Sequence, residues 1–234
     1  MKLKYAVFVV VGMLFSVQSA FAGGAITGKI GFEGTAPAAE KIAMNADRFC
    51  EGAHKDVVVS ETVVVNSNNT LKNVFVYVKE GLEGQTFETP NTPVVFDQSS
   101  CMYSPHVFGA QVNQDIQIIN SDSTLHNVHS MGEKNKGFNL GMPIKGMKLK
   151  KKFGEPEVMV KIKCDVHPWM NAYVGVLPHP FYAVSGDDGT FKIENLPAGT
   201  YTIESWHEKY GTQTQQVTVG EGESKTADFS YKAA

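Results

Sequence analysis

The sequence lacks any long segment in which apolar residues recur at helical spacing, which argues against a helical fold. Basic charge is not in excess: the formal net charge is −3, and this balance argues against nucleic acid as a partner. No Ser/His/Asp or paired-carboxylate arrangement stands out. The chain has instead many short apolar runs, separated by glycine, asparagine, aspartate and proline, which is typical of an all-β protein.

The N-terminus carries the features of an export signal. Lys2 and Lys4 precede an apolar run over about 5–17, and Ala-Phe-Ala at 20–22 offers a small-x-small cleavage site. A transmembrane anchor is disfavoured because spanning a bilayer needs about 20 apolar residues. No cysteine follows the cleavage site, which argues against a lipid anchor. We therefore predict a signal peptide at 1–22, no stable membrane insertion, and a periplasmic or secreted protein.

The stretch 164–170, Cys-Asp-Val-His-Pro-Trp-Met, contains three ligand types that copper favours. A thiolate and two imidazoles in a trigonal plane, with a weak axial thioether, make a mononuclear blue-type copper site. Cys164, His167 and Met170 supply three of these groups, and His126 is the best candidate for the second imidazole. The sequence therefore predicts one copper ion bound by His126, Cys164, His167 and Met170.

Strand parity supports this ligand set, because alternate residues of a strand share one face. The inward face before the loop is expected to carry Val158, Val160, Ile162 and Cys164, and the inward face after it Met170, Ala172, Val174 and Val176. The thiol and the thioether then point inward from adjacent strands. Asn127 is expected to brace the ligand loop through its side-chain amide, and Pro168 to stiffen it.

The chain has three cysteines. If Cys164 binds copper, Cys50 and Cys101 remain for each other in an oxidising compartment, so we predict that they form a disulfide.

Four other histidines are more often hydrogen-bonded structural residues than ligands: His106, His129, His179 and His207. The alternative is a second metal site, formed where His106, His179 and His207 meet or with a contribution from His129.

The short apolar runs predict strands at 25–32, 57–65, 71–78, 94–96, 107–112, 116–120, 158–164, 173–176, 191–194, 201–206 and 215–219. Both faces are apolar over 75–78, which indicates a central strand. Residues 66–69 read as a hairpin turn, and 132–154 as an irregular surface excursion. Residues 45–54 are either a short helix or an elaborated loop.

Residues 92–177 resemble a cupredoxin. The resemblance rests on Tyr-Ser-Pro at 103–105 before a strand, on Asn-Ser-Asp at 120–122 followed by His-Asn-Val at 126–128, and on Cys-x-x-His-Pro-x-Met at 164–170. This last loop is similar to the short ligand loop of amicyanin. The resemblance implies a Greek-key β-sandwich with a mononuclear copper site.

Asp-Gly-Thr-Phe-Lys-Ile at 188–193 and Leu-Pro-Ala-Gly-Thr-Tyr at 196–201 resemble the carboxypeptidase regulatory-like module, a transthyretin-like β-sandwich. Such modules open with two further strands, which are found at 26–30 and 71–78. We therefore predict a discontinuous sandwich, with residues 23–91 and 178–234 enclosing the copper domain at 92–177. The alternative is two consecutive domains.

The leading functional hypothesis is an electron carrier, not an enzyme, in which His167 presents an exposed edge to a redox partner protein. The basic residues over 145–152 and the Trp169 ring are candidates for that contact, although Trp169 could equally be packing. The alternatives are periplasmic copper binding and delivery, a mononuclear copper enzyme and a structural binding module. The paired His-Cys-His and His-x-His motifs that multicopper oxidation needs are missing.

Overall fold

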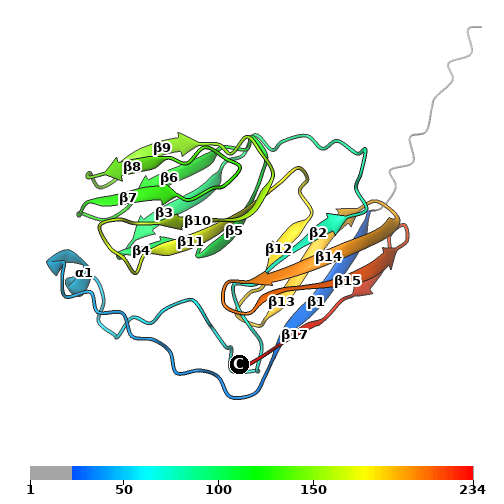
Figure 1. The fold of residues 1–234 in the computed structure, drawn as a ribbon, viewed down its shortest axis with the longest axis horizontal. Helices are drawn as coiled ribbons and strands as arrows, with labels where there is room; N and C mark the ends of the chain where they lie inside the picture. The colour runs from blue at the N-terminus through cyan, green and yellow to red at the C-terminus, as the bar shows by residue number, and fades with distance from the viewer. Residues whose placement is uncertain (1–22, 234) are drawn as a thin grey trace, which may run out of the picture.

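The computed structural model describes residues 23–233, so the signal peptide predicted at 1–22 lies outside the described residues. Figure 1 shows two β-sandwiches side by side, and one short helix at the end of the 94–177 sandwich that is remote from the other sandwich. Within 23–233 the fold is nearly all β, as the sequence predicts. None of the helices in this range is long and apolar enough to cross a membrane.

The first sandwich is formed by residues in the middle of the chain. One sheet has the strand order β5-β11-β10-β7-β8 and the other the order β4-β3-β6-β9. The strands are β3 (Val94–Ser99), β4 (Met102–Ser104), β5 (Val107–Gln111), β6 (Ile116–Asn120), β7 (His126–Ser130), β8 (Asn139–Met142), β9 (Lys148–Lys151), β10 (Glu157–Lys163) and β11 (Asn171–Leu177). Buried residues from both sheets, among them Phe96, Ile118 and Val174, share one core.

The second sandwich takes its strands from both ends of the chain. One sheet has the order β13-β1-β16 with β17 also paired to β1, and the other has the order β12-β2-β14-β15. The strands are β1 (Gly24–Glu33), β2 (Phe75–Glu80), β12 (Tyr182–Val184), β13 (Thr190–Leu196), β14 (Gly199–His207), β15 (Gly211–Val219), β16 (Ser224–Thr226) and β17 (Phe229–Lys232). Because β1 and β2 pair only with strands that follow the first sandwich, the second is discontinuous, as predicted.

Two local predictions within this sandwich are confirmed. Strand β2 is central, and its first four residues, Phe75 to Val78, are all buried. The turn at 66–69 is present: Asn69 has a φ of 59°, and the Asn66 N–H donates to the Thr70 carbonyl at 2.7 Å. Asparagine tolerates this left-handed conformation better than most residues, which is why it marks the turn.

Three sequence expectations are wrong. Residues 57–65 form no strand; only isolated bridges join Lys41 to Val59 and Val65 to Leu71. The excursion over 132–154 contains β8 and β9, two edge strands of only four residues each. Val158 is 38% exposed because the pairing of β10 shifts between Glu157 and Val160, which changes the parity of the strand.

A third apolar cluster joins the two sandwiches. Phe75 and Tyr77 of β2 pack with Val107 of β5 and Leu177 of β11. Glycine is required on the first sandwich at this contact, since a Cβ on Gly109 would lie 2.2 Å from the Tyr182 ring, and one on Gly175 would lie 2.4 Å from the Phe75 ring. The two sandwiches therefore share a packed apolar interface.

A histidine–carboxylate hydrogen bond with little solvent contact also joins the sandwiches. His106 Nε2 lies 2.8 Å from Glu208 Oε2, and the two side chains are only 4% and 8% exposed. We expect Glu208→Ala to lower the free energy of unfolding by about 3–5 kcal/mol, since it leaves His106 buried without its partner. Glu194→Ala, which removes an exposed partner of Lys192, is the control and should cost at most about 1 kcal/mol. Urea unfolding measures both, and equal small losses would contradict the prediction.

Candidate metal centre

The ligand loop is a tight connection between two adjacent strands of the first sandwich. Strand β10 ends one residue before Cys164, and β11 begins one residue after Met170. The Cys164 N–H donates to the Met170 carbonyl, and the Met170 N–H to the His167 carbonyl, each at 3.0 Å. These bonds fold the loop so that His167 lies above the end of the β10–β11 pair.

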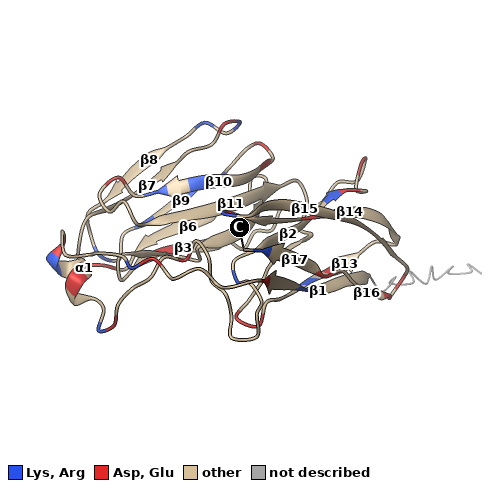
Figure 2. Cartoon of the chain, turned by 60° about the horizontal axis from the view of Figure 1, so that its bottom comes forward, with Lys and Arg blue, Asp and Glu red and all other residues tan. Residues whose placement is uncertain are grey.

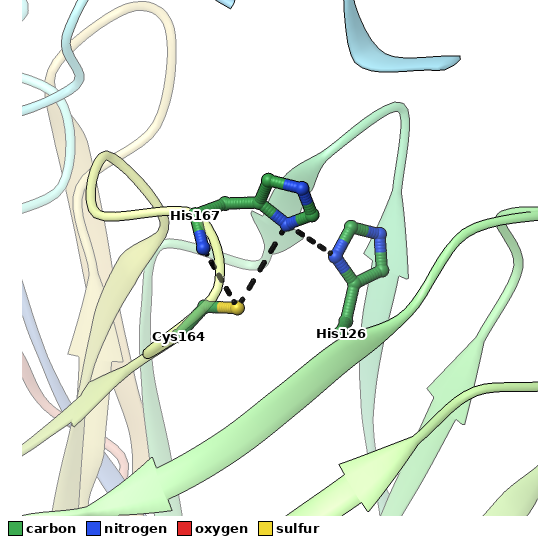
Figure 3. A group of neighbouring side chains, drawn as sticks. All are labelled: His126, Cys164 and His167. Atoms are coloured by element: carbon green, nitrogen blue, oxygen red, sulfur yellow. Dashed lines mark hydrogen bonds between the residues drawn. The ribbon is translucent and has the colours of Figure 1, made fainter. Parts of the chain in front are cut away.

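Three of the four predicted ligands lie together (Figure 3). His126, the first residue of β7, places its Nδ1 2.9 Å from Nδ1 of His167. Cys164 Sγ lies 3.9 Å from the same His167 nitrogen, and the His167 N–H donates to this sulfur at 3.4 Å. All three side chains are buried, with at most 2% exposed. A thiol and two imidazoles therefore converge on one enclosed point.

The other nitrogen of each imidazole is held by a carboxylate. His126 Nε2 lies 2.9 Å from Asp122 Oδ2, and His167 Nε2 lies 3.1 Å from Asp47 Oδ2. Burial lowers the pKa of His126, against the opposing effect of Asp122, so this ring is neutral near pH 7. A carboxylate oxygen that accepts from Nε2–H favours the neutral tautomer whose lone pair is on Nδ1.

In that tautomer the two Nδ1 lone pairs face each other at 2.9 Å, and they repel unless a proton or a metal ion lies between them. Nitrogens bound to one ion at about 2.0–2.1 Å lie about 3–3.5 Å apart, close to the spacing seen here. One thiolate and two imidazoles form the donor set that suits copper. The residues present therefore fit a bound copper ion.

Asn127 contacts the ligand loop as expected of a bracing residue. Its Oδ1 accepts from the Asp165 N–H at 2.7 Å and from Cys164 Sγ at 3.3 Å, and its Nδ2 donates to Asp165 Oδ2 at 3.1 Å. Hydrogen bonds from Lys163 and Asn139 hold the pKa of Asp165 well below its usual range. The carboxylate therefore stays charged and keeps the loop attached to β7 and β8.

The remaining loop residues have different environments. Met170 is fully buried in the same apolar cluster as Cys164, and Pro168 is exposed. The Trp169 indole N–H donates to the Cys101 carbonyl at 2.9 Å, and its ring centroid lies 5.1 Å from that of His167. Trp169 is thus partly buried against the centre, which favours the packing role over a free docking surface.

The expected exposed edge of His167 is wrong, because this side chain is only 2% exposed. The long connection between β1 and β2 runs to the end of the first sandwich, where it forms α1 (Arg48–Gly52), before it returns (Figure 1). Met44 and Cys50 of this connection are buried in the core of the first sandwich. We call residues 34–62 the covering segment.

Asp47 and Asp122, which contact the two imidazoles, are not indicated by the sequence. Asp47 precedes α1 and accepts from the Phe49 and Cys50 N–H groups as its N-cap. Asp122 accepts from the Ser100 and Cys101 N–H groups, each at 2.7 Å, as well as from His126. An aspartate directly before a short helix is a recognisable N-cap, but nothing local indicates that it also reaches His167.

Cys50 and Cys101 are joined in a disulfide, with 5.5 Å between their Cα atoms. The bond ties α1 of the covering segment to the turn between β3 and β4. Cys164 is the free cysteine, and it is buried.

Removing this disulfide is expected to cost about 4 kcal/mol in the chain-entropy model, since it closes a loop of 51 residues. The Cys50→Ala/Cys101→Ala double variant should show this loss in urea unfolding. Cys164→Ala, which leaves the disulfide intact, is the control for a lost buried sulfur. Thiol titration of the denatured, metal-free protein should find one free thiol, and three without reductant would contradict the bond.

The candidate second site is not assembled. His106 pairs with Glu208, His129 with Asp165, and His179 Nε2 donates to the Val78 carbonyl. His207 Nδ1 accepts from the Lys209 N–H at 3.0 Å, and burial lowers its pKa to about 4. Within 23–233, the clusters of three or more histidine, cysteine or carboxylate ligands all lie around His126 and His167. These four histidines have structural partners instead.

Comparison with known proteins finds both predicted resemblances. Residues 165–232 match the carboxypeptidase regulatory-like domain. A purple cupredoxin from Nitrosopumilus maritimus is 24% identical, with a TM-score of 0.31, over 36% of this chain and 98% of that one. A mutant of amicyanin in its Cu(I) form is 23% identical, with a TM-score of 0.33, over 38% of this chain and 86% of that one.

A Cu-containing nitrite reductase from Thermus scotoductus is 18% identical, with a TM-score of 0.34, over 40% of this chain. This chain spans only 24% of that protein's length. Among curated proteins, none matches the chain.

Proposed function

We propose that this protein binds one copper ion through His126, Cys164, His167 and Met170 and serves as an electron carrier. The observation that carries the proposal is the pair of Nδ1 atoms that face each other beside the Cys164 thiol, each ring being held through Nε2 by a carboxylate. Bound copper would supply a one-electron Cu(I)/Cu(II) couple. The protein holds the ligands rigid and excludes water, which limits rearrangement when the charge changes.

The visible spectrum of the copper-titrated protein tests this proposal. One equivalent of Cu(II) should produce an intense thiolate charge-transfer band, which saturates at a single ion per chain and bleaches reversibly on reduction. A chain that binds no copper, or binds it without such a band in either oxidation state, would contradict the electron-carrier role. Zn(II) occupancy is the control, because it fills the site without a redox couple.

Copper binding and delivery is the second candidate, and the burial of His167 favours it. A carrier passes electrons most directly through an exposed ligand, whereas here the covering segment lies over the imidazole. A protein that binds Cu(I), stays colourless and transfers the Cu(I) to a chelating partner would support delivery. The same titration therefore distinguishes the two functions.

The proposed partner is a redox protein that docks near the basic residues over 145–152, in a periplasmic or extracellular compartment. Lys145 and Lys148 are exposed, while Lys150 and Lys152 pair with Asp115, at 3.3 and 3.2 Å. Figure 2 shows charged residues of both signs in the loops of both sandwiches. Electrostatic attraction of a partner would therefore be confined to the region around 145–152. Association that slows with added salt would support an acidic partner surface.

A further inference from the structure

His167 is held by a residue from outside the first sandwich. Asp47 lies in the covering segment, 120 positions before His167, and its Oδ2 accepts from His167 Nε2 at 3.1 Å. Thr124 Oγ1 donates to the same oxygen at 2.9 Å. One carboxylate oxygen therefore connects the covering segment to a predicted ligand and to the loop that precedes β7.

The other oxygen of Asp47 has a separate task. Oδ1 accepts from the Phe49 N–H at 2.7 Å and from the Cys50 N–H at 3.3 Å, which caps α1. The helix is in turn fixed to the first sandwich by the Cys50–Cys101 disulfide and by the burial of Cys50 in its core. The carboxylate is thus immobilised on one side and directed at the imidazole on the other.

We propose that Asp47 is a positioning residue for the metal centre, and that the covering segment exists in part to deliver it. By accepting a hydrogen bond from Nε2–H, Asp47 selects the tautomer of His167 whose Nδ1 lone pair faces His126 and Cys164. The inference rests on the proposed copper site. Asp122 does the same for His126, but it belongs to the sandwich itself, so only the His167 side depends on the covering segment.

Two substitutions separate this role from helix capping. Asp47→Ser keeps an oxygen that can cap α1, but its hydroxyl is too short to reach the imidazole. Asp47→Asn keeps one acceptor oxygen, which can serve either α1 or His167 but not both, because the other position becomes an NH2 donor. Glu51→Gln removes an exposed carboxylate from the same helix and controls for the lost charge.

The experiment uses the full chain and two readouts. Nitrogen-15 NMR of the metal-free protein, at a pH where the rings are neutral, reports the tautomer of His167. Competition with a chromophoric Cu(I) chelator reports the affinity for copper alone. We expect Asp47→Ser to lose the single Nε2–H tautomer and to bind Cu(I) about 10–100-fold more weakly. Asp47→Asn, with one acceptor left, should fall between Asp47→Ser and the wild type, and Glu51→Gln should stay close to the wild type.

The outcomes are distinguishable. A wild-type chain without affinity for Cu(I) contradicts the proposed function. If the wild type binds Cu(I) but Asp47→Ser leaves either the tautomer or the affinity unchanged, the role of Asp47 is overturned. It is equally overturned if Glu51→Gln loses as much affinity as Asp47→Ser, since the lost negative charge and not the acceptor would then account for the effect.

Discussion

A chain that ends at Pro178 is expected to be insoluble when it is expressed. The strands that pair with β1 are β13, β16 and β17, and those that pair with β2 are β12 and β14; all of them follow Pro178. The truncated chain would keep Ile26, Ile30 and Val76, which are fully buried in the whole protein, without the sheets that cover them. Unpaired apolar strands are templates for aggregation. The soluble fraction after expression, and cooperative unfolding of that fraction, measure the effect.

The control is a chain that lacks only the last two residues, which lie beyond β17 and should leave solubility unchanged. The fragment 92–177 keeps all the strands of the first sandwich but loses Asp47 and the covering segment. We expect it to bind copper more weakly than the whole chain. A chain of 23–178 that is soluble, unfolds cooperatively and binds copper would contradict this expectation, since β1 and β2 would then not need the strands that follow Pro178.

The features that could be predicted from the sequence are those with a local signal. The loop 164–170 places three ligand types at fixed offsets, and alternation places Ile162, Cys164 and Ala172 inward. The central strand β2 is apolar on both faces, and the Asn-rich turn before it has a residue with positive φ. In each case neighbouring residues carry the whole pattern, so no knowledge of distant contacts is needed.

The covering segment could not be predicted, because its effect comes from contacts that are remote in sequence. Asp47 is an ordinary helix N-cap by its local pattern, and only folding brings it to His167, 120 positions away. The same holds for β8 and β9, edge strands of four residues each, which are too short for their alternation to stand out in the sequence. At Met159 in β10 a positive φ of 62° interrupts the regular alternation. No glycine stands beside Met159, so the sequence gives no sign of this irregularity.

Replacing Cys164 by alanine is expected to abolish any intense visible absorption of the copper-titrated protein while the chain still folds. Only a cysteine thiolate gives that band, and the other two cysteines are joined to each other. The substitution removes a buried sulfur that contacts Asn127 at 3.3 Å, so we expect a loss of stability of about 1–2 kcal/mol, well short of unfolding. Absorption spectra and thermal unfolding of the variant, with copper added, measure the two effects.

Variants of the other predicted ligands separate loss of colour from loss of copper. His126→Ala should weaken copper binding and open a position to water. Met170→Leu keeps the thiolate and both imidazoles, so it should keep the band. The reduction potential should rise, because Cu(II), the more electron-poor state, loses more stabilisation than Cu(I) when the axial donor is removed. The ligand assignment is wrong if Cys164→Ala with bound copper keeps the colour of the wild type, since no other residue in the assigned set could then account for the band.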